Sequence, residues 1–239
     1  MYGWRARVGT VLPAASTILP NEFLKVAPDG VIMVYTRIFI QKLTKEQLGD
    51  LDQQIEQTVK LLMPCKPQFI IQAASPLVWT SGPGYDKKII EKVERVAGVP
   101  ATTTATAVMK ALNRFKAKKV NVATPYPDWI NTQVKSFLEA TGFEVLNIKG
   151  LGMELPNETA KLTPDVAYNL ARQVFAEAPN ADCMFISCGN MRTFEIIEKL
   201  ERDLGVPVET NNQAAIFESF STLKIRDPIR GYGKLFEMI

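Results

Sequence analysis

Short apolar runs rich in β-branched residues alternate with longer amphipathic segments along the whole chain of 239 residues. The short runs have the length and composition of strands that are buried on both faces of a parallel sheet. They lie at 7–13, 30–36, 68–73, 119–123, 143–148 and 183–187. The intervening segments have helical spacing, at 45–63, 85–96, 103–115, 128–141, 164–178, 193–204 and 211–221. This alternation predicts an α/β fold with right-handed crossovers and helices on both faces of each sheet.

The sequence also repeats itself. V-G-T-V-L-P ending at Pro13 matches V-N-V-A-T-P ending at Pro125, and F-I-I-Q-A-A-S around Ala74 matches C-M-F-I-S-C-G around Cys188. A third pair, V-A-G-V-P ending at 100 and D-L-G-V-P ending at 207, keeps the same order. The separations are 112, 114 and 107 residues, which indicates a duplicated unit.

A duplicated unit predicts two pseudo-symmetric lobes, each a short parallel sheet flanked by helices, with the active-site cleft between them. We expect residues 1–115 to form the first lobe and residues 116–219 the second. The C-terminal tail, 220–239, is expected to pack back on the first lobe. Ligands of open α/β sheets bind beyond the carboxyl ends of the strands, so residues that follow strands are the candidate site residues.

The chain contains no histidine, which removes Ser-His-Asp and Cys-His catalysis and histidine-based metal sites. Its three cysteines form no C-x-x-C pair, which argues against a zinc site, a redox motif or a disulfide framework. The G-x-G-x-x-G and G-x-x-x-x-G-K-[ST] phosphate-binding motifs are both missing. We therefore expect neither a metal nor a cofactor.

The net charge of +3 is small and scattered, so neither nucleic acid nor an anionic membrane surface is an expected partner. No apolar stretch approaches the roughly 20 residues of a membrane span, and the N-terminus lacks the apolar core of a signal peptide. The expected location is the cytoplasm.

Cys188 is the strongest candidate for chemistry. It directly follows a predicted strand in S-C-G-N-M-R-T, and the expected helix at 193–204 suggests a thiol near a helix N-terminus, where ionisation is easier than usual. Gly189 permits close approach of a ligand, and its N–H can donate to an oxyanion. Cys65 and Cys183 fit ordinary structural roles.

The other strand ends supply fewer polar groups. Ala74 occupies the first-lobe position that corresponds to Cys188, and Ser75 after it offers a hydroxyl and an N–H. Tyr126 stands between two prolines in T-P-Y-P and is a candidate hydrogen-bond donor. Pro13 and Ser16 are at the corresponding turn of the first lobe.

Several segments resemble the aspartate/glutamate racemase superfamily: L-P-A-A-S at 12–16, A-T-P-Y at 123–126, S-C-G-N at 187–190, the two G-V-P triplets and G-Y-G-K-L-F-E at 231–237. The chain is most similar to arylmalonate decarboxylase and more distantly to maleate cis-trans isomerase. The resemblance runs from 8 to 237.

The resemblance implies roles for these residues. Racemases and maleate isomerases of the superfamily use one cysteine from each lobe, whereas arylmalonate decarboxylase keeps only the second-lobe cysteine. Ala74 and Cys188 follow the one-cysteine pattern, so Cys188 would be the proton donor. Ser75, Tyr126 and Gly189 would form a dioxyanion hole around the retained carboxylate of the substrate, with Asn190 beside them. An apolar pocket from which carbon dioxide leaves would be lined by Ile40, Leu43 and Leu77.

The expected function is therefore cofactor-independent decarboxylation of an aryl- or alkenyl-substituted malonate, with a small carboxylate or dicarboxylate as the ligand. A lone acid suffices for this reaction, whereas racemisation needs an acid and a base on opposite faces. An isomerase or racemase that uses Cys188 with another partner stays an alternative. So does a non-catalytic carboxylate-binding protein, because Pro76 removes one backbone donor of the hole and Pro156 and Thr159 change the pocket. The sequence leaves open whether the protein is a monomer or a dimer.

Overall fold

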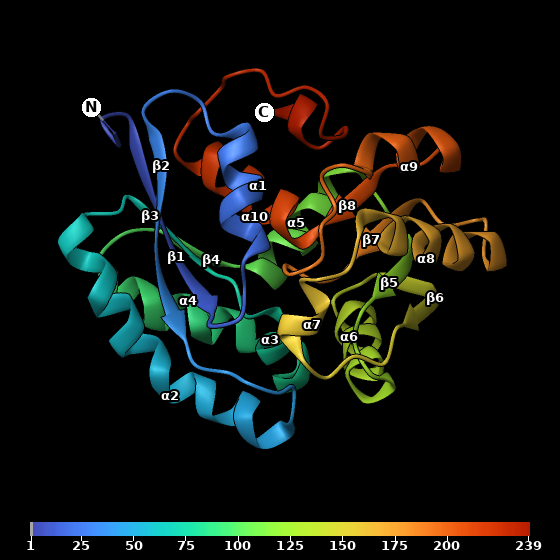
Figure 1. The fold of residues 1–239 in the computed structure, drawn as a ribbon, viewed down its shortest axis with the longest axis horizontal. Coiled ribbons are helices and arrows are strands. Elements are labelled where there is room, and N and C mark those ends of the chain that lie inside the picture. Colours follow the sequence, from blue (N-terminus) through green and yellow to red (C-terminus); the bar gives the residue numbers. More distant parts are fainter. Residues whose placement is uncertain (1) are drawn as a thin grey trace.

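The computed structural model describes residues 2–239, which form two four-stranded parallel sheets that lie side by side (Figure 1). The first sheet has the strand order β2-β1-β3-β4 and the second has the order β6-β5-β7-β8. The strands of the first are β1 (Ala6–Pro13), β2 (Val31–Ile38), β3 (Phe69–Gln72) and β4 (Ala101–Thr103). Those of the second are β5 (Lys119–Thr124), β6 (Glu144–Gly150), β7 (Cys183–Ile186) and β8 (Val208–Thr210).

Equivalent hydrogen bonds confirm the duplication seen in the sequence. In the first sheet Ala73 N donates to Val11 O at 2.9 Å, and in the second Ser187 N donates to Ala123 O at 2.8 Å. These pairs reproduce the separations of 112 and 114 residues.

The third separation is reproduced at the last strand of each sheet. Ile70 N donates to Pro100 O and Met184 N donates to Pro207 O, both at 3.0 Å. The predicted α/β class and its two pseudo-symmetric lobes are thus confirmed.

Ten α-helices connect and cover the strands of the described chain, 2–239. In the first half they are α1 (Ile18–Val26), α2 (Lys45–Leu62), α3 (Ser75–Ser81), α4 (Tyr85–Ala97) and α5 (Thr104–Arg114). In the second half they are α6 (Asp128–Ala140), α7 (Pro156–Thr159), α8 (Pro164–Glu177), α9 (Ile197–Leu204) and α10 (Asn211–Thr222). Short 3₁₀ turns occur at η1 (Met63–Cys65) and η2 (Phe236–Met238).

The helices form layers around the sheets. In the first lobe α2 packs on β1 and β2 and α4 packs on β4 and α2, whereas α1 and α10 lie together on the other side of the sheet (Figure 1). In the second lobe α6 packs on β6 and α8 packs on β5. None of the helices formed by residues 2–239 combines the length and the hydropathy that a membrane crossing requires.

Two strands and three helices of the structure are not predicted by the sequence. The three-residue strands β4 and β8 are too short for a periodicity signal, and both end directly at a helix. Helices α1, α3 and α7 contain prolines near their first turns, at Pro20, Pro76 and Pro156. The helix expected at 193–204 begins four residues later, at Ile197, because the chain after Cys188 forms an irregular loop.

An aromatic cluster joins the two sheets. Trp79 on α3 is fully buried, and its ring centroid lies 4.9 Å from that of Phe137 on α6 and 6.5 Å from that of Phe185 on β7. Both neighbours meet it edge-on, the geometry that aromatic pairs prefer. The two lobes therefore share one hydrophobic core.

The C-terminal tail contacts elements from both halves of the chain. Asp227 forms an ion pair with Arg5 at 2.5 Å, and the carbonyl of Met238 accepts a hydrogen bond from Arg114 at 2.9 Å. On the other side Lys234 N donates to Glu201 at 3.1 Å.

Candidate active site

A small cavity of about 50 Å³ lies between the two sheets, at the carboxyl ends of the central strands. Pro13 ends β1, Ala74 follows β3, Tyr126 follows β5 and Cys188 follows β7, and all four line the cavity. The remaining wall is formed by Ser16, Ile40, Leu43, Leu48, Leu51, Ala73, Ser75, Pro76, Pro156, Thr159, Gly189 and Asn190. Every candidate residue named from the sequence is in this wall except Leu77. That residue is buried on α3, where it packs in the core.

Cys188 is held as a thiol. Its side chain is 9% exposed, and burial raises its pKa to about 11, although hydrogen bonds from Asn190 N–H, Tyr126 and Met191 N–H act in the opposite direction. The Asn190 N–H donates to the sulfur at 3.3 Å. The expectation of an easily ionised thiol is therefore wrong: α9 begins nine residues after Cys188, and burial dominates.

Tyr126 and Ser75 place hydroxyl groups near the thiol. Burial, reinforced by the neighbouring Cys188, raises the pKa of Tyr126 well above its usual value, so this phenol keeps its proton. The Ser75 oxygen accepts a hydrogen bond from the Asn211 side chain at 2.8 Å. Because that bond occupies a lone pair, the Ser75 hydroxyl hydrogen is free to be donated toward the cavity.

The turn that carries Tyr126 is fixed from behind. Tyr126 N donates to the Thr124 hydroxyl at 3.0 Å, and Tyr126 O accepts from the Asn131 side chain at 3.2 Å. A Cβ at Gly150 would lie 2.2 Å from Tyr126 O, so the edge strand must carry glycine there.

Two backbone N–H groups complete the polar side of the cavity. Ser75 is the first residue of α3 and Gly189 follows the thiol, and neither N–H donates a hydrogen bond to any residue of the described range 2–239. A Cβ at Gly189 would lie 2.9 Å from Asn212 Oδ1, so this close approach of α10 also depends on glycine. Pro76 adds no N–H, as the sequence indicated.

Asn190 holds the two lobes together. Its amide nitrogen donates to Ala15 O at 3.2 Å and Pro156 O at 2.7 Å, and its oxygen accepts from Thr17 N at 3.0 Å. Both amide hydrogens are therefore used within the protein, and none remains for a carboxylate.

The part of the cavity wall that comes from residues 40–51 is apolar. Ile40 and Leu43 come from the loop before α2, and Leu43 N donates to Glu154 O at 2.9 Å, which ties this loop to the one before α7. Leu48 and Leu51, which extend this wall, are not predicted as site residues by the sequence. Their place on the buried face of a predicted helix that follows the Ile40 loop was the only signal for them.

The chain matches the protein family described as arylmalonate decarboxylase over residues 8–236. It is 23% identical over 231 residues to arylmalonate decarboxylase of Bordetella bronchiseptica, with 96% of each chain covered. Among solved structures, a double mutant of arylmalonate decarboxylase in the liganded form superposes with a TM-score of 0.92 at 23% identity, covering 98% of this chain and 100% of that one.

A mutant of the maleate isomerase of Pseudomonas putida S16, solved with maleate, also superposes with a TM-score of 0.92. Its identity is 20%, and 97% of each chain is covered. These structures share the two-lobed fold described above. Because the family match extends over nearly the whole chain, this protein belongs to the arylmalonate decarboxylase family.

Proposed function

We propose that the protein decarboxylates a 2-substituted malonate without a cofactor, through an enediolate that Cys188 protonates. The observation that carries this proposal is the composition of the cavity wall: it combines one un-ionised thiol and several neutral donors with a group of aliphatic side chains. This composition suits a substrate with two carboxylates, one of which is retained while the other leaves as carbon dioxide.

The polar side would hold the carboxylate that stays. Its candidate donors are the Tyr126 phenol, the Ser75 hydroxyl and the N–H groups of Ser75 and Gly189. As carbon dioxide leaves, negative charge accumulates on the oxygens of this carboxylate. Each well-placed donor can then stabilise the transition state by roughly 3–4 kcal/mol.

The apolar side would face the carboxylate that leaves. Ile40, Leu43 and Leu51 are nearly fully buried and offer no hydrogen bond to replace water. A carboxylate against this wall loses solvation that the neutral carbon dioxide product does not need. Breaking the bond between the α-carbon and the carboxylate leaves its electron pair in the enediolate.

The final step is proton transfer from Cys188 Sγ to the α-carbon, which leaves a thiolate. Hydrogen bonds from the N–H groups of Asn190 and Met191 lower the pKa of this thiol and would stabilise that thiolate until water returns the proton. Since the donor lies on one side of the substrate, a malonate whose α-carbon carries two different substituents would yield a single enantiomer of the monocarboxylic acid.

Isomerisation of maleate is the second candidate, because maleate isomerases superpose on this chain as closely as the decarboxylase does. Ala74 opposes it. The first lobe has no thiol across the cavity from Cys188, and the high pKa of Cys188 disfavours nucleophilic attack by a thiolate.

A substrate panel separates these functions. Purified protein is incubated with aryl-, alkenyl- and alkylmalonates while release of carbon dioxide is followed, and separately with maleate while fumarate is followed. Release of carbon dioxide from an aryl- or alkenylmalonate supports the proposal, as does formation of one product enantiomer when the α-carbon carries a second substituent. Fumarate formation without carbon dioxide release would establish the isomerase instead, and binding without turnover would indicate a carboxylate-binding protein.

A further inference from the structure

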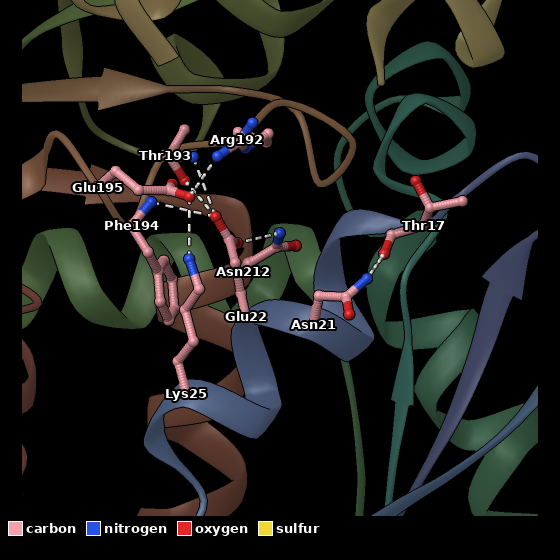
Figure 2. A network of polar contacts seen from close by, with 9 residues as sticks. All are labelled: Thr17, Asn21, Glu22, Lys25, Arg192, Thr193, Phe194, Glu195 and Asn212. Carbon is pink, nitrogen blue, oxygen red and sulfur yellow. Dashed lines mark hydrogen bonds and ion pairs between the residues drawn. The ribbon is translucent and has the colours of Figure 1, made fainter. Parts of the chain in front are cut away.

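Glu22 is a buried acid of the first lobe whose carboxylate is bound by the loop that carries Cys188. It is on α1 and is 2% exposed. Its Oε1 accepts hydrogen bonds from Thr193 N at 3.0 Å, Thr193 Oγ1 at 3.3 Å and Phe194 N at 3.1 Å (Figure 2). These N–H groups are in the irregular loop between β7 and α9, where no regular secondary structure would satisfy them.

The second carboxylate oxygen reaches the residue next to the thiol. Glu22 Oε2 accepts from Asn212 Nδ2 at 2.6 Å, and the same nitrogen donates to Gly189 O at 3.0 Å. Figure 2 shows Asn212 beside the carboxylate, between α1 and the loop. One side chain of the first lobe thus holds the second-lobe loop at residues 193 and 194 directly and at residue 189 through Asn212.

The helix that bears Glu22 is itself fixed. Phe23 is fully buried and meets Phe220 of α10 edge-on, with 5.6 Å between ring centroids. The corresponding helix of the second lobe, α6, buries Ile130, Asn131, Val134, Phe137 and Leu138 and no carboxylate. The duplicated fold therefore does not require an acid here, and this one is specific to the lobe that faces Cys188.

The charged neighbours do not neutralise Glu22. Lys25 of α1 and Arg192 of the loop both pair with Glu195, at 2.9 Å each, and α10 presents the neutral Asn212. A buried charge without a cationic partner is costly, and it persists only where several donors bind it.

We propose that Glu22 is a positioning residue, whose carboxylate fixes the Cys188 loop against the first lobe and so sets the place of the thiol and of the Gly189 N–H. This inference rests on the proposed function for its kinetic consequence, but its structural part is independent of any substrate. Residues that orient a reacting group from behind commonly change rates by about 10- to 100-fold when they are replaced.

The test compares Glu22→Gln with Glu198→Gln, a control on the first turn of α9, directly after the loop, whose side chain is exposed and forms no ion pair with any residue of 2–239. Iodoacetamide is added at pH 8, and alkylation of the three cysteines is measured by peptide mass spectrometry. We expect iodoacetamide to alkylate Cys188 about tenfold faster in Glu22→Gln than in the wild type. The alkylation rates of the exposed Cys65 and the buried Cys183 should stay unchanged. Glu198→Gln should behave as wild type.

Kinetics supply the second readout. On a malonate that the wild type decarboxylates, Glu22→Gln should lower kcat about tenfold with KM within twofold of wild type, because the loss concerns the transition state. Burial raises the pKa of Glu22 to about 7, so wild-type kcat should fall below that pH, whereas the variant should lack this inflection. A wild type that releases no carbon dioxide defeats the proposed function but leaves the alkylation result to decide the role of Glu22.

An unchanged alkylation rate of Cys188 in Glu22→Gln overturns the inference, and so does a parallel rise at Cys183, which would mean general loosening. Should the variant not fold, amide exchange at Thr193 and Phe194 of the wild type decides. After correction for intrinsic rates, their protection should fall between pH 8 and pH 6 while that of α8 stays constant; equal protection at both pH values would contradict the proposal.

Discussion

At the scale of single residues, the environment of Cys188 favours a proton donor over a nucleophile. Burial raises the pKa of the thiol to about 11, which keeps the proton on the sulfur at neutral pH. The N–H of Asn190, 3.3 Å from the sulfur, favours the thiolate that forms once the proton has left. The thiol thus meets both requirements of the proposed role, a bound proton before the reaction and a stabilised thiolate after it.

Replacing this thiol tests its role directly. Cys188→Ala should reduce decarboxylation by about 10²–10⁴-fold, the usual contribution of a positioned acid, while the midpoint of thermal unfolding stays close to that of the wild type. Cys65→Ala is the matched control, since Cys65 is exposed and does not line the cavity. If Cys188→Ala retains most of the activity, the acid is another group.

Glu22 makes stability depend on pH in an unusual direction. Its pKa is raised from 4.5 to about 7 in the folded protein, so between these values the folded state holds more protons than the unfolded chain. The contribution of Glu22 to the free energy of unfolding is then largest below pH 4.5 and decreases as pH rises to about 7, by roughly 3 kcal/mol.

Urea unfolding of wild type and Glu22→Gln at pH 5 and pH 8 measures this contribution. The difference in stability between the two proteins should shift in favour of Glu22→Gln at pH 8, where the wild type keeps a buried charge. A difference that is equal at both pH values would show that Glu22 does not titrate with the raised pKa.

At the scale of secondary-structure elements, the cavity depends on close contacts behind the strand ends. Gly150 ends β6 where the Tyr126 turn crosses it, and a Cβ there would lie 2.2 Å from Tyr126 O and 2.3 Å from Asn131 Nδ2. The glycine thus allows the edge strand to support the turn that presents the phenol to the cavity.

Gly150→Ala should therefore move this turn. We expect a loss of about 1–3 kcal/mol in the free energy of unfolding, as is typical of overpacking, together with a raised KM for any carboxylate that Tyr126 binds. Gly49→Ala on α2 is the control, because a Cβ at Gly49 meets no atom within 4 Å. A Gly150→Ala melting curve equal to that of the wild type would mean that the turn adjusts without strain.

The length and the pairing of each element explain how far the sequence predicts the structure. Strands such as β1 and β7 are apolar runs buried on both faces, so hydrophobic pattern alone identifies them. β4 and β8 have three residues each and are defined by pairing with a neighbouring strand, which no local pattern encodes. Helix α3 begins at Ser75–Pro76, where proline at the first turn reads equally well as a loop.

The site residues also divide into those that the sequence predicts and those that it does not. Ala74, Tyr126 and Cys188 follow central strands, so topology alone brings them to one cavity. Leu77 was expected beside them, but helix α3 turns it into the core. Glu22 could not be found from the sequence, because its partners Thr193 and Asn212 are about 170 and 190 residues away in the chain.

At the scale of the whole molecule, the duplication brings two equivalent strand ends, one from each sheet, to the wall of one cavity. The rings of Trp79, Phe137 and Phe185 pack together across the two lobes, and Asn190 joins the lobes by hydrogen bonds. The distance between Ala74 and Cys188 is therefore set by a shared core rather than by a flexible linker. The two positions differ in chemistry, since only one carries a thiol.

Restoring the missing thiol tests this geometry. Ala74→Cys should give the protein racemase activity toward the 2-substituted monocarboxylic acid that decarboxylation produces. One cysteine, as thiolate, would remove the α-proton from one face while the other, as thiol, delivers a proton to the opposite face. The two groups must then titrate as a coupled pair, with one proton shared between them.

Only acids whose α-carbanion is delocalised should respond, because the α-proton of a simple carboxylate is very weakly acidic. The measurement is loss of optical rotation of a single-enantiomer 2-arylpropionate, with uptake of deuterium at the α-carbon in heavy water. We expect deuterium exchange with Ala74→Cys and none with Ala74→Ser, because serine is close to cysteine in size but has no acidic thiol. A folded Ala74→Cys protein that still decarboxylates but exchanges no deuterium would mean that position 74 does not face the α-carbon, and that the pseudo-symmetry relates the strands without relating their reactive positions.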